Sequence, residues 1–277
     1  MKNINLVGAA LFSFIAIFTS QSALAQADQS KPLSKPTDPH FNLLPGFLPA
    51  ASLPDSLRLL RSPPASDSAA LAQDEAARQD AARLKGSPRW RLAVRDADLN
   101  FPQPAENFSC AMGISIDAQN TPHLYKLMQR MLTDVGLSTY GVKNKFQRTR
   151  PFARHAEGTC TPGDEDILRT DGSYPSGHSA VGWGWALVLA EINPERSDEI
   201  LSRGLAFGQS RVICNAHWQS DVDAGRIMAA ATVARLHSDS SFAAELQAAR
   251  AEALRSRQAN LKPRNDCVAE AASLSER

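Results

Sequence analysis

The sequence carries almost no net charge, because 30 lysines and arginines stand against 29 aspartates and glutamates. A protein that binds nucleic acid over its surface needs an excess of basic groups to displace the counterions of the phosphates. The balance therefore argues against general nucleic-acid binding. With 43% apolar and 21% charged residues over 277 positions, the composition excludes a disordered chain and a disulfide-rich miniprotein. A chain of 277 residues is long enough for one large domain or two small ones.

The sequence also lacks several motifs of metal and nucleotide chemistry. It has no P-loop, and its six histidines show neither HExxH nor the short paired spacing of a zinc site. We therefore expect no metal and no cofactor. Four of the histidines are expected to be ordinary surface or core residues: His40, His123, His155 and His237.

Apolar runs long enough to span a bilayer are missing as well. The run Leu6–Phe18 is shorter than the roughly 20 residues that a bilayer needs, and no later run reaches that length without a charge or a turn residue. The early run precedes a small-x-small pattern at 23–25, which is typical of a signal peptide covering 1–25 and cleaved after Ala25 or Ala27. An uncleaved membrane anchor is the alternative. We expect an exported protein, periplasmic in a Gram-negative source.

Cysteine is scarce but even in number. Cys110, Cys160, Cys214 and Cys267 permit two disulfides in three connectivities, which fits an oxidising compartment. A buried pair of free thiols is the alternative.

Strand-like alternation and internal repeats are absent, so we expect an all-α, single-domain helical bundle over 68–257. A proline-rich stretch, 26–67, precedes it as an extended arm, and a tail, 258–277, follows. Propensity and apolar spacing predict helices over 68–84, from Pro122 to about 135, over 179–192, through 200–205, from a cap at Ser220 to about 236, and over 241–257. The last of these is expected to be solvent-exposed.

Three short segments concentrate polar residues suited to an anion. In the first, Lys143 and Arg150 are seven residues apart, so a helix would place both cations on one face, two turns apart. Pro151 marks where such a helix fails. Taken alone, the segment also fits a solvated basic face.

The second segment, Gly172–Ser179, is a Gly/Pro/Ser turn that opens directly into an apolar helix. Backbone N–H groups at such a helix start, with a serine hydroxyl, point toward an anion. His178 would lie beside the anion, where imidazole exchanges a proton near neutral pH. Taken alone, the segment also fits a plain capped turn.

The third segment, Ser210–Asp221, contains a histidine and a carboxylate four residues apart, His217 and Asp221. One helical turn would bring the carboxylate within hydrogen-bonding reach of one imidazole nitrogen. That contact fixes the tautomer and leaves the other nitrogen as a nucleophile. A structural ion pair is the alternative.

Together the segments resemble the tripartite signature of the type 2 phosphatidic-acid-phosphatase (PAP2) superfamily, which also contains the vanadium haloperoxidases. The signature reads Lys143-x6-Arg150-Pro151, then Pro175-Ser176-Gly177-His178, then Ser210-Arg211-x5-His217-x3-Asp221. The strings at 172–178, 186–194 and 217–222 are similar to those of bacterial class A non-specific acid phosphatases. The resemblance covers about residues 68–250.

The resemblance implies a role for each signature residue. His217 would be the nucleophile that forms a phosphohistidine, and Asp221 would orient it. His178 would be the general acid that protonates the leaving oxygen and later the base that activates water. The phosphate oxygens would be bound by Lys143, Arg150, Arg211, the Ser176 hydroxyl and the Gly177 amide. The family requires no metal ion.

These roles favour an exported acid phosphatase that hydrolyses phosphate monoesters of broad range, with phosphate transfer to alcohols where these outcompete water. An acidic working range follows, because His178 must be protonated while His217 presents a free nitrogen. A vanadate-dependent haloperoxidase and a non-catalytic phosphate-binding protein are the alternatives. A membrane-embedded lipid-phosphate phosphatase is disfavoured by the missing spans. Asn215 is expected to shape its turn rather than to contact the ligand.

The expected partners are therefore small phosphate monoesters. Neither nucleic acid nor stable membrane insertion after signal cleavage is expected. Association into a homo-oligomer stays open, since the proline-rich arm could serve that purpose.

Overall fold

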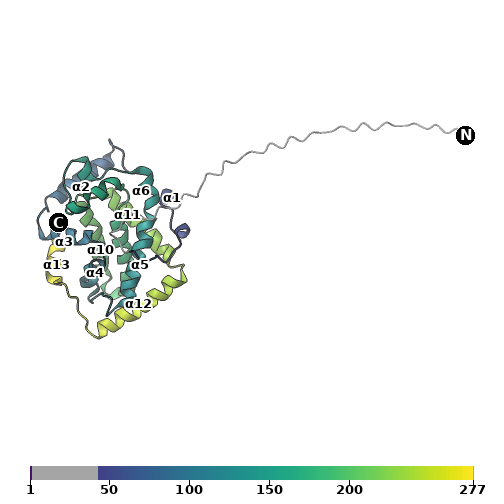
Figure 1. Cartoon of the computed structure of the whole chain (residues 1–277), viewed down its shortest axis with the longest axis vertical. Helices are drawn as coiled ribbons and strands as arrows, with labels where there is room; N and C mark the ends of the chain where they lie inside the picture. Colours follow the sequence, from purple (N-terminus) through teal and green to yellow (C-terminus); the bar gives the residue numbers. More distant parts are fainter. Residues whose placement is uncertain (2–42, 277) are drawn as a thin grey trace. The chain divides into compact units, whose positions relative to one another are not determined.

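The computed structural model describes Met1 and residues 43–276, and this part of the chain contains helices and no strands (Figure 1). The expected all-α fold is confirmed. The signal peptide expected over 1–25, Met1 apart, and the arm up to residue 42 lie outside the described residues. In chain order the elements are η1 (Ala50–Ser52), α1 (Ser56–Leu59), α2 (Ala69–Ala82), α3 (Pro88–Ala97), α4 (Gln103–Met112), α5 (Pro122–Ser138), α6 (Tyr140–Phe146), α7 (Pro151–Arg154), η2 (Pro162–Asp164), α8 (Glu165–Thr170), α9 (Gly177–Ile192), η3 (Pro194–Arg196), α10 (Ser197–Ile213), α11 (Gln219–Leu236), α12 (Ser240–Gln258) and α13 (Cys267–Ser275).

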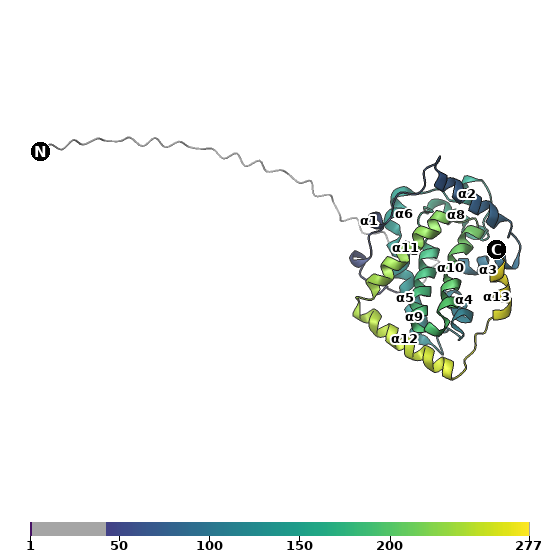
Figure 2. The same ribbon diagram turned by 180° about the vertical axis from the view of Figure 1, so that it is seen from behind.

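The centre of the bundle is α9, which packs against α5, α10 and α11 (Figure 2). Most of its residues are buried, as expected of a helix that is apolar on nearly every side. The ring of Trp185 lies 6.0 Å from the rings of Phe108 and Phe207, and its indole N–H donates to the carbonyl of Met128 at 2.9 Å. Because the buried indole keeps its hydrogen bond, this contact fixes α9 against α5.

The helices expected from apolar spacing are present, but α11 begins differently. The sequence predicts a cap at Ser220, whereas the helix starts at Gln219 and its N-cap is Trp218. The reason is Asp221, whose carboxylate accepts the backbone N–H of Trp218 at 2.9 Å. An acidic side chain at the third helical position often bonds the N-cap amide in this way.

The expectation of a solvent-exposed final helix is wrong in two respects. First, α12 buries a stripe formed by Phe242, Leu246, Ala249 and Ala253, and it packs against α5. The stripe is hard to recognise in a sequence rich in alanine, glutamate and arginine, because two of its four residues are themselves alanines. Second, α12 is followed by α13.

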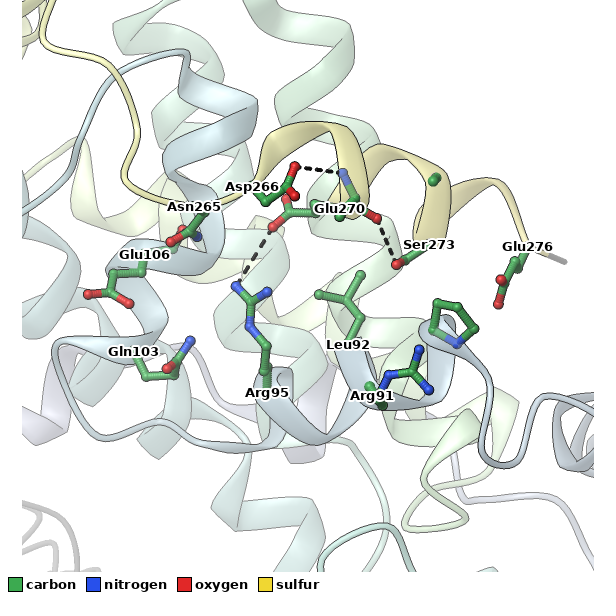
Figure 3. A pocket seen from close by; sticks show the side chains of 13 residues that line it. Arg91, Leu92, Arg95, Gln103, Glu106, Asn265, Asp266, Glu270, Ser273 and Glu276 are labelled. Atoms are coloured by element: carbon green, nitrogen blue, oxygen red, sulfur yellow. Dashed lines mark hydrogen bonds and ion pairs between the residues drawn. The ribbon is translucent and has the colours of Figure 1, made fainter.

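Among the described helices of nine or more residues, three have no counterpart in the sequence-based expectations: α3, α4 and α13. The Cys110–Cys267 disulfide joins α4 to α13. Arg95 of α3 lies 3.8 Å from Glu270 of α13, beside a groove between the three helices (Figure 3). No residue that lines this groove is an expected site residue.

The described part of the proline-rich stretch, 43–67, packs onto the helices. Phe47 is 6% exposed, its N–H donates to Asp134 at 2.7 Å, and its ring meets that of Phe242 at 5.3 Å. Further along, the Ser56 hydroxyl accepts the N–H of Val142 in α6 at 3.0 Å. The segment therefore contacts α5, α12 and α6.

The four cysteines form two disulfides, Cys110–Cys267 and Cys160–Cys214, which decides among the three connectivities left open. The second bond ties the loop after α7 to the end of α10. Among the described helices, none combines the length and the apolar character needed to cross a bilayer.

Candidate active site

Lys143 and Arg150 both form ion pairs with the carboxylate of Asp171, although they do not lie on one face of a shared helix. The shared helix face that the spacing would give does not form, because α6 ends at Phe146 and Gln147 adopts a left-handed conformation with φ 43°. Lys143 and Arg150 are 2% and 3% exposed. Lys143 Nζ lies 3.2 Å and Arg150 Nη2 3.0 Å from Oδ2 of Asp171. A turn, rather than two helical turns, therefore brings the cations together.

The Gly172–Ser179 segment forms the start of α9 beside these cations. Ser176 is the N-cap, and its Oγ accepts hydrogen bonds from the N–H of Ser179 at 3.2 Å and from the Ser179 hydroxyl at 2.9 Å. This leaves the proton of Ser176 Oγ to donate to an anion. Gly177 is the first helical residue, and its N–H is one of the amides that a helix start leaves without an intrahelical acceptor.

His217 forms the expected pair with Asp221, with 3.4 Å between Nδ1 and Oδ2. The other nitrogen, Nε2, lies 2.8 Å from Nη1 of Arg150. Because a guanidinium only donates hydrogen bonds, Nε2 must carry the lone pair and Nδ1 the proton. Burial, followed by the charges of Arg150 and Lys143, holds the pKa of His217 well below its ordinary value. The site thus contains a neutral imidazole with a basic nitrogen turned toward the cations.

The side chain of Arg211 adds unpaired hydrogen-bond donors to the site around His217. Its side chain is buried, and its Nε and Nη1 have no hydrogen-bond partner among the described residues. Burial and then the charge of Arg150 lower its pKa to about 10. A buried cation with unpaired donors is costly unless an anion joins it. Together with Lys143 and Arg150, this geometry makes an anion-binding site.

His178 lies at the same site, held by the end of α3. Its Nε2 is 2.9 Å from the carbonyl of Ala97, so Nε2 donates and Nδ1 is the nitrogen free to exchange a proton. Burial, and then the charge of Arg211, lower the pKa of His178 well below its ordinary value. In the free site, burial and the neighbouring cations therefore favour the neutral form of both histidines.

Four residues that the sequence did not single out complete the site: Asp74, Arg148, Ser173 and Asp171. Arg148 Nη1 donates to Asp221 at 2.5 Å, and its Nη2 donates to Asp74 at 2.7 Å. Ser173 Oγ donates to Asp221 Oδ2. The Asp221 carboxylate is thus fixed from several sides. Arg148 and Ser173 lie inside the conspicuous segments, whereas Asp74 lies in α2 without any local motif.

Asn215 shapes the turn before His217, as expected. Its φ is 59°, a left-handed conformation that asparagine tolerates better than most residues. Its side-chain NH₂ group donates to Glu157 at 2.9 Å, and its backbone carbonyl accepts the N–H of Phe152 at 3.2 Å.

The charged groups of this site are suited to an anion rather than to a metal ion. Within the described residues, no group of three or more histidine, cysteine, aspartate or glutamate side chains is placed to hold a metal. The cations around His217 are lysine and arginine side chains.

Comparison with known proteins places these residues in context. The profile of the PAP2 superfamily matches residues 126–243. A non-specific acid phosphatase of Providencia stuartii is 48% identical over 199 residues, which cover 72% of this chain and 80% of that protein. An acid phosphatase of Zymomonas mobilis is 40% identical over 84% of this chain and 83% of its own length. A non-specific acid phosphatase of Salmonella typhimurium is 45% identical over 70% of this chain and 78% of its own length.

Proposed function

This chain belongs to the PAP2 superfamily, among its acid phosphatases, and on that basis we propose that it hydrolyses phosphate monoesters through a phosphohistidine on His217. The observation that carries the proposal is the buried guanidinium of Arg211 with two unpaired donors, next to Arg150 and the lone pair of His217 Nε2. A phosphoryl group at this point would satisfy the donors and present phosphorus to the nucleophile.

In the first half-reaction, His217 Nε2 attacks phosphorus in line with the leaving oxygen. The N–P bond forms, the P–O bond breaks, and His178 passes its Nδ1 proton to the leaving oxygen. Asp221 stabilises the positive charge that develops on the phosphorylated ring through Nδ1–H. Arg150 Nη1 turns from Nε2 to a phosphate oxygen. Phosphoryl transfer gains chiefly from such fixed charge on the equatorial oxygens.

In the second half-reaction, the neutral His178 takes a proton from water, whose oxygen attacks phosphorus. The P–N bond breaks, and orthophosphate and free His217 result. An alcohol in place of water gives a new phosphate ester, so phosphotransferase activity is part of the proposal. The named residues bind only the phosphoryl group, which supports a broad range of leaving groups.

The protonation states fit an acidic working range. Because its pKa is lowered, His217 keeps Nε2 unprotonated in mildly acidic solution. The lowered pKa of His178 means that its imidazolium forms only as the pH falls. A bound phosphate dianion offsets the charge of Arg211 and raises the pKa of His178, so the acid is available when substrate is present.

We also propose export to the periplasm. The signal-like residues 1–25 and the two disulfides support it, because disulfides persist in oxidising compartments.

A trapping experiment tests the phosphohistidine. Wild-type protein is mixed with a ³²P-labelled monoester in the presence of a chelator and quenched in alkali, where phosphohistidine survives. We expect label on the wild type, and on His217→Ala neither label nor turnover, with kcat at least about 10³-fold lower. His123→Ala, which alters a half-exposed histidine of α5, is the matched control. Substantial turnover by His217→Ala would contradict the mechanism.

A further inference from the structure

We propose that Asp171 is a built-in competitor of the substrate: its carboxylate occupies Lys143 and Arg150 in the free enzyme and must leave them when phosphate binds. This inference rests on the proposed phosphate-binding role of the two cations. It identifies Asp171 as a residue that sets the affinity for the phosphoryl group.

One oxygen of Asp171 serves both cations. Oδ2 lies 3.2 Å from Lys143 Nζ and 3.0 Å from Arg150 Nη2. These are the two cations that a phosphate oxygen would bind next to His217 Nε2. A carboxylate oxygen and a phosphate oxygen are equivalent acceptors for such donors. Both anions would draw on the same two cations, and two anions at this distance repel each other, so the carboxylate opposes phosphate binding.

The backbone around Asp171 holds the cations independently of its carboxylate. Lys143 Nζ donates to the carbonyl of Gly172 at 2.5 Å. Arg150 Nε donates to the carbonyls of Leu168 and Asp171 at 2.8 and 3.0 Å. The side chains of Lys143 and Arg150 therefore remain positioned when the carboxylate departs. The carboxylate is thus not needed as a support.

Asp171 is also the member of this cluster that can move. Its side chain is 30% exposed, whereas those of Lys143 and Arg150 are 3% and 2% exposed. A small cavity of about 70 Å³ adjoins it, lined in part by Arg148 and Arg169. The carboxylate can rotate toward this space and toward solvent while the cations stay in place.

Asp171→Asn removes the charge and keeps the shape, so it tests the competition. Measurements are made at pH 6, where Lys143 is protonated because its pKa is about 8. We expect the KM for p-nitrophenyl phosphate and the Kd for orthophosphate to fall together, by about 3- to 10-fold, the size of a partly exposed ion pair. The value of kcat should change by less than about twofold. Asp171→Glu retains the charge and should bind orthophosphate within about twofold of the wild type.

The matched control is Asp166→Asn, which removes an exposed carboxylate from α8; its constants should equal those of the wild type. A higher KM with a lower kcat in Asp171→Asn would show that the carboxylate positions the cations, and would overturn the proposal. Unchanged orthophosphate affinity, or an equal gain in Asp171→Glu, would overturn it too. Calorimetric binding of orthophosphate requires no turnover. It therefore tests Asp171 even if the trapping experiment on His217 fails.

Discussion

At the scale of single residues, the two histidines of the site share surroundings and differ in which nitrogen is free. Arg150 and Asp221 leave His217 with a basic Nε2, and the carbonyl of Ala97 leaves His178 with a free Nδ1. One ring is thus prepared for attack and the other for proton transfer. Hydrogen-bond partners, rather than the type of residue, make this distinction.

Replacing His178 by alanine tests its role as the acid. A leaving group such as p-nitrophenolate departs without a proton, whereas an alkoxide requires one. We expect His178→Ala to lower kcat for an alkyl phosphate by about 10²- to 10⁴-fold and for p-nitrophenyl phosphate far less. Wild-type kcat for the alkyl ester should fall as the pH rises, because the lowered pKa of His178 depletes its imidazolium. Equal losses on both substrates would contradict this role.

The sequence predicts the residues of the site better than their supports. The polar segments predict Lys143, Arg150 and His178 beside an anion, and the family resemblance adds Arg211. The structure brings all four to His217. The sequence does not predict Asp74 as part of the site, since this residue lies in a helix of ordinary composition. It contacts Arg148 and Ser220 only through the tertiary fold. No local pattern encodes such a contact.

At the scale of elements, the two helices that carry the site touch at a glycine. A Cβ atom on Gly225 of α11 would lie 2.5 Å from the carbonyl oxygen of Ser176 and 3.1 Å from the amide nitrogen of Ala180. Both neighbours are backbone atoms, one in the N-cap of α9 and one in its first turn, and they cannot rotate away. This close approach sets the distance between the phosphate-binding turn and the helix of Asp221.

We therefore expect Gly225→Ala to separate α11 from the start of α9. The kcat/KM should fall about tenfold or more, and the free energy of unfolding by about 1–3 kcal/mol. Gly184→Ala is the control, because its Cβ would meet a side-chain methyl of Val135 at 3.1 Å, further along α9. That variant should lose stability without a comparable loss of activity. Full activity in a destabilised Gly225→Ala protein would disprove the coupling.

Helix boundaries mark where sequence reasoning fails. Propensity and apolar spacing locate α5 and α9, yet they do not show that α6 ends before Arg150, and they place the cap of α11 at Ser220 instead of Trp218. A local feature decides each boundary. Gln147 adopts a left-handed backbone conformation that ends α6, and the hydrogen bond from the Trp218 N–H to the Asp221 carboxylate begins α11. Neither alters the apolar periodicity on which the prediction depends.

At the scale of the whole molecule, the two disulfides brace different regions. Cys160–Cys214 joins the loop after α7 to the turn that leads to His217, and the N–H of Cys160 also donates to the carbonyl of Cys214 at 3.3 Å. Cys110–Cys267 closes a sequence separation of 157 residues and fastens α13 to α4, beside the groove that contains no expected site residue. Stability and activity should therefore respond differently to the loss of each bond.

We expect Cys110→Ser/Cys267→Ser to lower the free energy of unfolding by about 2–5 kcal/mol while kcat stays within about twofold of the wild type. Cys160→Ser/Cys214→Ser should lower both, because it releases the turn that positions His217 Nε2 toward Arg150. Thermal unfolding and the hydrolysis of p-nitrophenyl phosphate, measured on both variants well below their Tm, separate the two effects. If the two variants lost activity in equal measure, the site would depend on the stability of the whole bundle rather than on the Cys160–Cys214 brace.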